Sequence, residues 1–183
     1  MATINVDRSD LTVALTGPES SGKSTLARQL GELFAAPVVP EVARSYLEGS
    51  EAGVTGYDQR DLLAISRLQR DAEQQLRAST SGLLICDTDL LVLQIWWQEK
   101  FGDLPEELVQ ALAKRTDRVY LLAEPDLPWA PDPLRENPTD RLRLFDLYVN
   151  ALETGGFRYS IISGSADARL QSALEGLVRL RVL

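Results

Sequence analysis

One segment near the N-terminus combines glycine, lysine and serine at a spacing that suits phosphate binding. Residues 17–24, GPESSGKS, match the pattern G-x-x-x-x-G-K-[ST]. Glycines let the backbone curl so that its N–H groups face a phosphate, and the positive end of a following helix strengthens the attraction. In this pattern Lys23 contacts the β- and γ-phosphates and the Ser24 hydroxyl coordinates Mg²⁺. The alternative interpretation is an ordinary glycine turn at the start of a helix.

The pattern predicts that the segment binds a nucleoside triphosphate together with Mg²⁺. A guanine-specific switch protein would carry an Asn-Lys-x-Asp segment, and none occurs in the chain, which favours ATP. Thr25 follows the pattern directly and is expected near the α-phosphate. The residues predicted to bind ATP are Gly17, Glu19, Ser20, Ser21, Gly22, Lys23, Ser24 and Thr25.

Two acidic residues follow the apolar run 83–86, which has the composition of a buried strand. An Asp directly after such a strand is typical of the second motif of nucleotide-binding proteins, where it holds Mg²⁺ or activates a nucleophile. Asp87 is therefore predicted to be a metal-binding and catalytic residue beside Ser24. Asp89 lies two residues further on, and we expect it to reach the same cleft and contact substrate. The alternative is that both aspartates only cap the helix that follows, a role that Asp performs well.

A third carboxylate, Glu41, comes after the short apolar pair Val38 and Val39. Ligands of open α/β sheets bind at the carboxyl ends of the strands, so Glu41 is placed to accept a proton from an acceptor hydroxyl. Because the chain has no histidine, Glu41 and Asp87 are the two candidates for general base. Arg44 lies one helical turn further on and is expected to pair with Glu41 or to contact phosphate. The alternative for Glu41 is a glutamate favoured by the dipole at a helix start.

The segment 124–140 is rich in proline and in charged residues. Small-molecule kinases often close such a lid over the triphosphate, which excludes water and brings arginine to the transferring phosphate. We predict a lid over 124–143, with Arg135 and Arg141 as its catalytic residues. The alternative is a solvated loop with surface Asp–Arg pairs.

Large aromatic side chains fall near the predicted cleft. The face of a Trp ring can stack on a planar ring, and more strongly on a cationic one. Trp96 and Trp97 are adjacent on an expected helix and cannot both point the same way, so we expect one of them in the core. Core packing is the alternative for each aromatic residue. The residues predicted to bind the acceptor are Glu41, Arg44, Tyr46, Asp89, Trp96 and Trp129.

Apolar runs and helical periodicities alternate along the whole chain. The expected strands are 11–16, 38–39, 83–86, 118–123 and 159–162. The expected helices are 24–34, 41–47, 58–79, 90–101, 105–115, 141–154 and 166–180. Such alternation is typical of α/β proteins with a parallel sheet. We predict one domain, 1–183, with the three-layer sandwich of P-loop NTPases, a mostly parallel sheet of about five strands, and the lid.

The composition argues against several classes of protein. Of 183 residues, 44% are hydrophobic and 25% charged, and the net charge is −8. An acidic chain repels the nucleic-acid backbone, so no nucleic-acid partner is expected. Apolar runs shorter than the roughly 18 residues of a membrane span, and an N-terminus without a secretion signal, predict a cytoplasmic protein without membrane contact. The single cysteine, Cys86, and the absence of histidine argue against a Cys/His metal cluster.

Four stretches, in chain order, carry a resemblance to a known family: GPESSGKSTL, EVARSYLE, ICDTDLLVLQIWW and WAPDPLRENPTDR. They resemble the nicotinamide riboside kinase domain of the bacterial bifunctional NAD-salvage proteins, a branch of the P-loop kinases grouped by name with AAA-type domains. The resemblance implies transfer of a phosphoryl group from ATP to nicotinamide riboside, which gives nicotinamide mononucleotide. It also implies that Asp87 and Asp89 form the family's Asp-x-Asp motif and that Arg135 and Arg141 are its lid arginines.

Members of the bifunctional type carry an adenylyltransferase domain before the kinase, whereas ten residues precede the first expected strand of this sequence. We therefore expect a stand-alone kinase module that binds a small-molecule acceptor. Two alternatives stay open. One is another nucleoside or metabolite kinase on the same scaffold, and the other is a nucleotide-binding regulatory module with weak ATPase activity. The sequence leaves the oligomeric state open.

Overall fold

A parallel sheet of five strands forms the centre of the molecule. The computed structural model describes residues 10–49, 56–132 and 139–183. The strands are β1 (Leu11–Thr16), β2 (Val38–Val39), β3 (Leu83–Asp87), β4 (Arg118–Ala123) and β5 (Tyr159–Ile162). They stand in the order β2-β3-β1-β4-β5, and all four neighbouring pairs are parallel. The predicted α/β class and the five-stranded sheet are confirmed.

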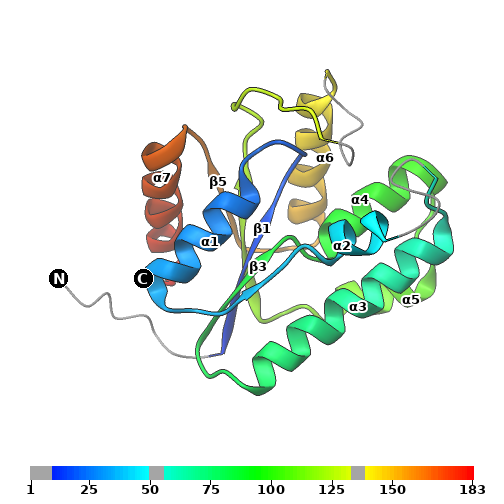
Figure 1. Cartoon of the computed structure of the whole chain (residues 1–183), viewed down its shortest axis with the longest axis horizontal. Helices are drawn as coiled ribbons and strands as arrows, with labels where there is room; N and C mark the ends of the chain where they lie inside the picture. Colours follow the sequence, from blue (N-terminus) through cyan, green and yellow to red (C-terminus); the bar gives the residue numbers. More distant parts are fainter. Residues whose placement is uncertain (1–9, 50–55, 133–138) are drawn as a thin grey trace.

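Helices cover both faces of the sheet, which explains why its strands are short apolar runs. Every residue of β3 and of β4 is buried. The helices are α1 (Lys23–Phe34), α2 (Val42–Glu48), α3 (Gln59–Ala78), α4 (Leu90–Phe101), α5 (Glu106–Ala113), α6 (Arg141–Thr154) and α7 (Ala166–Arg179). Figure 1 shows α1 and α7 on one side of the sheet and α3, α4 and α6 on the other. This is the predicted three-layer sandwich.

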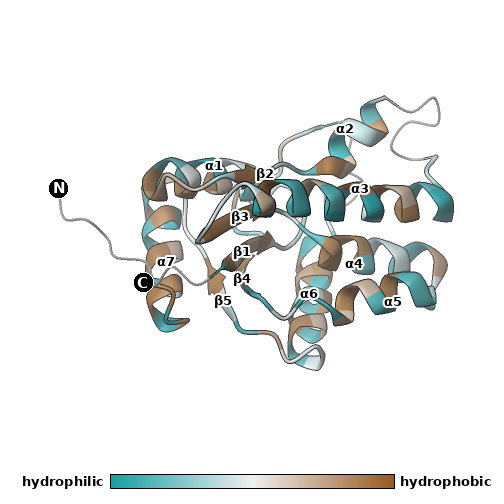
Figure 2. Cartoon of the chain, turned by 90° about the horizontal axis from the view of Figure 1, so that it is seen from below, coloured by the Kyte–Doolittle hydropathy of each residue, from teal (hydrophilic) through white to brown (hydrophobic). Residues whose placement is uncertain are grey.

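Apolar clusters fill the space between the sheet and its helices. One cluster joins Leu30 of α1 and Leu177 of α7 to one face of the sheet. A second cluster joins Ile95 of α4 and Tyr148 of α6 to the opposite face. A third lies among α2, α3, α4 and α5, beyond the edge of the sheet. Figure 2 shows the apolar strands at the centre, with helices of mixed hydropathy around them.

The carboxyl ends of the parallel strands meet at one edge of the sheet. β1 lies in the middle, with β3 on one side and β4 on the other, so the direction of chain progression reverses at β1. Ligands of open α/β sheets bind at such a reversal point. Gly17 follows β1, Glu41 lies just beyond β2, and Asp87 is the last residue of β3. The topology therefore brings the predicted phosphate-binding and acidic residues to one edge.

The first half of helix α4 is apolar on nearly all sides, and the buried residues of the helix are Leu90, Leu91, Val92, Leu93, Ile95 and Trp97. A helix of this kind belongs inside a protein. It contacts α3, α5 and α6, so it connects the second cluster to the third. Within the described ranges, no helix combines the length and the hydropathy that crossing a membrane requires.

Candidate active site

The glycine-rich segment 17–24, called the P-loop below, forms a tight turn between β1 and α1. Gly17 and Gly22 have φ angles of 125° and 79°, which residues with a Cβ rarely adopt. A Cβ at Gly17 would also lie 2.7 Å from the carbonyl oxygen of Ala123 on β4. The Lys23 ammonium folds back and donates to the carbonyl oxygens of Gly17 (2.9 Å) and Pro18 (2.7 Å). The loop therefore forms a ring around its own lysine.

The start of α1 is suited to an anion. In the described structure, Gly22 is the N-cap residue, no side chain caps the helix, and the first turn contains no acidic residue. The first N–H groups of a helix have no partner within the helix and carry its positive dipole end. Backbone donors and the Lys23 ammonium are thus collected in one turn, as the sequence pattern predicts for a phosphate site.

The Ser24 hydroxyl lies close to the Asp87 carboxylate at the edge of the sheet. Asp87 is 7% exposed, and among the described residues its Oδ1 atom has no hydrogen-bond partner. The hydroxyl of Thr16, the last residue of β1, is likewise buried without a partner in that part of the chain. A buried polar oxygen without a partner calls for an explanation such as an ion. Mg²⁺ takes oxygen ligands, one or two from carboxylates and the rest from water and phosphate, so these donors fit it.

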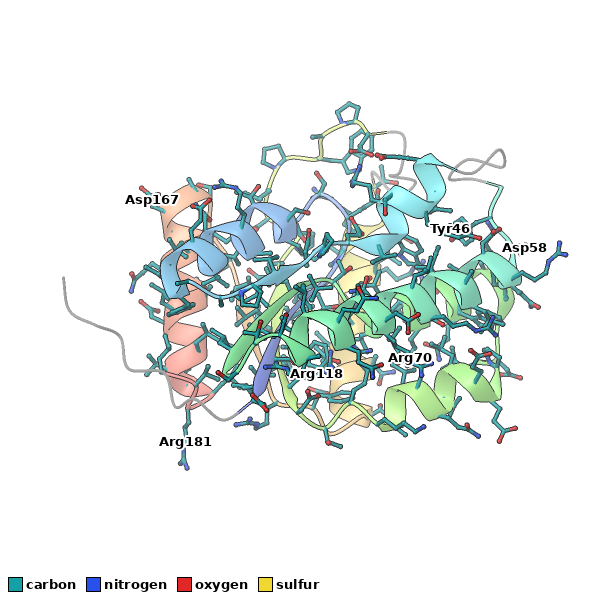
Figure 3. The ribbon with its side chains drawn as sticks, turned by 60° about the horizontal axis from the view of Figure 1, so that its bottom comes forward. Tyr46, Asp58, Arg70, Arg118, Asp167 and Arg181 are labelled. Atoms are coloured by element: carbon teal, nitrogen blue, oxygen red, sulfur yellow. The ribbon has the colours of Figure 1, made fainter. Side chains whose placement is uncertain are left out.

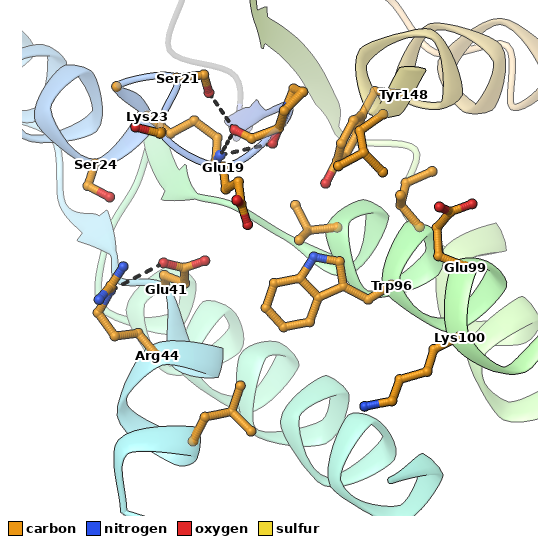
Figure 4. A pocket seen from close by; sticks show the side chains of 18 of the residues that line it. Glu19, Ser21, Lys23, Ser24, Glu41, Arg44, Trp96, Glu99, Lys100 and Tyr148 are labelled. Carbon is orange, nitrogen blue, oxygen red and sulfur yellow. Dashed lines mark hydrogen bonds and ion pairs between the residues drawn. The ribbon is translucent and has the colours of Figure 1, made fainter. Parts of the chain in front are cut away.

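Glu41 lies at the start of α2 and lines the same cavity as Lys23 (Figure 4). Burial raises the pKa of the Glu41 carboxyl, and the positive charge of Lys23 offsets part of that rise. Burial also raises the pKa of Asp87, and the nearby Ser24 hydroxyl and the charge of Lys23 offset part of that rise. A carboxylate with a raised pKa is a better proton acceptor than an ordinary one, so both predicted bases have a suitable environment.

A cavity of about 550 Å³ extends from the P-loop to a wall formed by α2, α4 and α6. Figure 4 shows Lys23 and Ser24 at one end, with Trp96 and Tyr148 across from them. The wall is formed by Leu47, Tyr57, Val92, Ile95, Trp96, Glu99, Lys100, Leu144 and Tyr148. This volume lies in the range of pockets that bind small organic molecules. One cavity therefore combines a phosphate-binding turn with a largely apolar and aromatic wall.

Trp96 is the indole of this wall. Its ring stacks on that of Tyr57, with the centroids 5.9 Å apart and the planes at 29°. Lys100 lies over the Tyr57 ring, with Nζ 3.5 Å from the ring centroid, and donates to the Tyr57 carbonyl oxygen (3.0 Å). These contacts fix the orientation of the indole. Trp97, in contrast, is 3% exposed and its N–H donates to the Asp103 carbonyl oxygen (2.8 Å), so it belongs to the core.

Two residues predicted to bind the acceptor lie away from the cavity. The Tyr46 hydroxyl donates to Asp61 Oδ1 (3.0 Å), so its polar end joins α2 to α3. Asp89 is 2% exposed and caps α4 by accepting from the Leu91 N–H (2.9 Å). The left-handed φ of 73° at Thr88 turns the backbone between the two aspartates, so only the first of them faces Ser24. The structure does not support substrate contact for Tyr46 or Asp89.

The described part of the predicted lid lies against the P-loop. The Trp129 indole N–H donates to Glu19 Oε1 (3.2 Å). Arg141, the first residue of α6, donates to the carbonyl oxygens of Leu127 (3.0 Å) and Ser20 (3.4 Å). Trp129 and Arg141 therefore connect the lid to the phosphate-binding turn.

The remaining predicted residues differ in what the structure shows of them. Arg135, the second predicted lid arginine, lies outside the described residues. Arg44 forms ion pairs with Glu41 (3.6 Å) and with Asp132 (3.2 Å), so it lines the cavity and also joins α2 to the lid. The predicted pairing of Arg44 with Glu41 is thus observed.

The sequence-based prediction missed the apolar residues of the cavity wall and four polar or aromatic ones: Tyr57, Glu99, Lys100 and Tyr148. Lys100 follows Trp96 by four positions, a spacing that places two residues on the same side of a helix and could have identified it. Tyr57 precedes α3 in a segment with the composition of a loop, and Tyr148 falls within the apolar stripe of α6. Neither tyrosine carries a local signal that separates it from a loop or core residue.

Comparisons with known proteins agree with this geometry. A family model described as AAA domain matches residues 12–169, which include the P-loop, Asp87 and the cavity wall. The chain belongs to this AAA domain family.

The relatives of this chain include a NAD biosynthesis/regulator protein. The chain is 33% identical over 156 residues to the trifunctional NAD biosynthesis/regulator protein NadR of Escherichia coli (strain K12). The alignment covers 81% of this chain and 37% of NadR, so the chain spans little more than a third of that relative. The predicted resemblance to the bacterial NAD-salvage proteins is confirmed.

Solved structures show the same fold. Crystal structures of NadR in complex with NR, and with NAD and AMP-PNP, match with TM-scores of 0.78 and 0.75. Both are 21% identical to this chain, and the matches cover 94% and 95% of it and 50% of each NadR chain. Thymidylate kinase from Ehrlichia chaffeensis matches with a TM-score of 0.63 at 16% identity, over 94% of this chain and 98% of that enzyme. The P-loop kinase fold is thereby confirmed.

Proposed function

We propose that the protein is an ATP-dependent kinase that phosphorylates a hydroxyl group of a small nucleoside-like acceptor, with nicotinamide riboside as the first candidate. One arrangement carries the proposal: a single cavity contains Lys23 and Ser24 at one end, Trp96 at the other, and Glu41 on its wall. The relationship to NadR, which has been crystallised with NR and with AMP-PNP, supports the choice of both substrates.

The P-loop end of the cavity is the proposed ATP site. Lys23 exchanges its two backbone contacts for oxygens of the β- and γ-phosphates, and the N–H groups of the loop and of α1 surround the phosphates. Ser24 and Asp87 are the proposed protein ligands of Mg²⁺. The bound ion supplies positive charge that neutralises the phosphate oxygens as the phosphoryl group transfers.

Glu41 is the proposed general base. The acceptor hydroxyl oxygen forms a bond to the γ-phosphorus, the bond from this phosphorus to the β–γ bridging oxygen breaks, and ADP leaves. The hydroxyl proton passes to Glu41, whose pKa burial has raised. Asp87 is less suited to this step, because its carboxylate lies beside Ser24 at the proposed Mg²⁺ position.

The lid supports the transfer by closing one side of the site. Arg141 and Trp129 join it to the P-loop, and a closed site excludes water that would compete with the acceptor. Arg135, on the same segment, is proposed to bring positive charge to the transferring phosphate.

The indole of Trp96 is the proposed platform for the acceptor ring. Nicotinamide riboside carries a pyridinium cation, and an indole stacked on a cation contributes about 0.5–2 kcal/mol. Glu19 and Glu41 line the same cavity and add negative potential near the riboside. These features suit a cationic ring. The apolar wall also accepts neutral bases, so an assay with several acceptors has to identify the substrate.

The test is ADP release in the presence of Mg²⁺ with a panel of acceptors: nicotinamide riboside, nicotinic acid riboside, thymidine and deoxyadenosine. We expect the highest kcat/KM with nicotinamide riboside. Lys23→Ala should abolish turnover. Arg28→Ala serves as a matched control on α1, because Arg28 forms an exposed ion pair with Glu32 on the same helix.

Three results would change the assignment. Turnover with thymidine or deoxyadenosine alone would make the protein a different nucleoside kinase. ADP release at the same rate with and without every acceptor would make it a regulatory module with ATPase activity. Normal turnover in Lys23→Ala would remove the assigned role of the P-loop.

A further inference from the structure

A buried cluster of four charged side chains lies behind the edge of the sheet that carries the site. Glu73 of α3, Asp89 at the start of α4, Arg115 after α5 and Arg118 of β4 are each at most 8% exposed. Arg115 is 2.7 Å from a Glu73 oxygen and 3.3 Å from an Asp89 oxygen. Arg118 is 3.3 Å from Glu73 and 3.1 Å from Asp89, and Figure 3 shows it below α3. Each arginine therefore bridges both carboxylates.

Asp89 has the most contacts in this cluster. Its Oδ2 accepts from the Tyr120 hydroxyl (2.8 Å) and from Arg118 (3.1 Å) and forms an ion pair with Arg115, and its Oδ1 accepts from the Leu91 N–H (2.9 Å). Removing four charges from water is expensive, and well-packed apolar residues of similar volume often stabilise a core equally well. Stability alone is therefore a weak reason for the cluster, whereas fixing the position of the Asp89 carboxylate is a specific one.

The position of Asp89 matters because of the residues before it. Asp89 is two residues from Asp87, and between them Thr88 has a φ of 73° and is 5% exposed. A β-branched residue in the left-handed region is strained, and such a conformation persists only where both ends are held. On one side Asp87 pairs with Leu15 in the register of β3 and β1. On the other side the cluster holds Asp89.

We propose that Asp89 is a positioning residue. Anchored by Arg115, Arg118 and Tyr120, it holds the turn 87–89 in the conformation that directs the Asp87 carboxylate toward Ser24 and the magnesium position. This inference rests on the proposed function, since it concerns the proposed magnesium site. Asp89, the second aspartate of the Asp-x-Asp pair, would support metal binding without contacting the metal or the substrates.

The experiment compares two variants that each remove one negative charge from the cluster. Asp89→Asn keeps the volume and the helix cap. Glu73→Gln is the matched control, because Glu73 lies on α3 and bonds to the same arginines. Calorimetry measures ATP binding with Mg²⁺ and with a chelator, and thermal melting is recorded for each protein.

We expect Asp89→Asn to lower the magnesium-dependent gain in ATP affinity by about 10–100-fold, the usual effect of losing a residue that orients a metal ligand. Its ATP affinity in chelator should equal that of the wild type, because the P-loop is unchanged. Glu73→Gln should melt at a lower temperature and keep the gain. Tyr120→Phe removes only one hydrogen bond to Asp89, so it should reduce the gain by a smaller factor. This variant tests the role of Asp89 if Asp89→Asn does not fold.

Two results would overturn the inference and leave the proposed function standing. The first is a full magnesium-dependent gain in ATP affinity in Asp89→Asn, or in Tyr120→Phe if Asp89→Asn does not fold. The second is a loss of this gain in Glu73→Gln that equals the loss in Asp89→Asn. A wild-type protein without any gain would remove the metal site of the proposed function, and the inference with it. Kinase assays on the wild type distinguish failure of the metal site from failure of the proposed function. Turnover without a magnesium-dependent gain in ATP affinity would contradict the assigned metal site but not the proposed phosphorylation of the acceptor.

Discussion

The Ser24 hydroxyl lies close to the Asp87 carboxylate, so the first turn of α1 meets the last residue of β3 at one edge of the sheet. The two residues are 63 positions apart, and the parallel pairing of β1 with β3 brings them together. Asp87 also keeps one buried oxygen without a partner among the described residues. The pair is therefore the best candidate among the described residues for a magnesium site beside bound phosphate.

Substituting Asp87 by Asn tests this site. The amide keeps the size of the side chain but removes the charge that attracts Mg²⁺. We therefore expect turnover to fall by a factor of about 100 or more, which corresponds to about 3 kcal/mol in the transition state. Steady-state kinetics at several Mg²⁺ concentrations measure the effect. Near-normal rates with unchanged magnesium dependence would make Asp87 a structural residue at a helix start.

The pH dependence of kcat/KM tests Glu41 as the base. Its pKa is raised by burial above the ordinary value of 4.5, and only the deprotonated form accepts a proton, so activity should rise with pH along an acid limb above pH 4.5. Glu41→Gln should remove this limb and lower the rate by about 10²–10⁴-fold. Glu48→Gln, on the same helix at an exposed position, is the control and should keep the wild-type profile. An unchanged limb in Glu41→Gln would transfer the role to Asp87.

The same carboxylate should lower stability at neutral pH. The pKa of the Glu41 carboxyl is higher in the folded than in the unfolded state, so folding favours the protonated form. The resulting contribution to stability is fully present below pH 4.5 and is lost as the pH rises through the folded-state pKa. Glu41→Gln has no such loss, so we expect a higher free energy of unfolding than the wild type at pH 7. The difference should vanish below pH 4.5 when measured by denaturant titration. A variant that is less stable at pH 7 would show that the ion pair with Arg44 outweighs burial.

Much of the scaffold follows from local sequence patterns. All five strands were predicted from apolar runs, and β3 differs only in including Asp87. The P-loop was predictable because its glycines, lysine and serine act within eight consecutive residues, where backbone geometry decides the outcome.

The acceptor site depends on contacts that the sequence does not display. Asp89 was expected in the cleft, but its partners Arg115, Arg118 and Tyr120 lie more than 25 positions further along the chain and fix it in the interior. The prediction also chose Tyr46, whereas Tyr57 lines the cavity, because the rotation of the short helix α2 is set by packing on α3. Long-range partners of this kind leave no local periodicity.

Trp96 and Trp97 should respond differently to substitution. Trp96→Ala removes the stacking surface, so the KM for the acceptor should rise by about 2–30-fold while the KM for ATP stays constant. Trp97→Phe keeps the contact with Phe101 but loses the bond to the Asp103 carbonyl, so it should cost about 1 kcal/mol of stability and leave both KM values unchanged. Steady-state kinetics and thermal melting separate the two effects. An equal rise in acceptor KM for both variants would contradict the assignment of Trp96.

The central claim is that the γ-phosphoryl group of ATP is transferred to a riboside hydroxyl in this cavity. The most direct measurement follows a radiolabel from the γ-position of ATP in a mixture of protein, Mg²⁺ and nicotinamide riboside, with the products separated by chromatography. The account predicts that the label appears in a phosphorylated riboside and that Lys23→Ala shows none. Label found only in inorganic phosphate, at a rate that the riboside does not change, would contradict it.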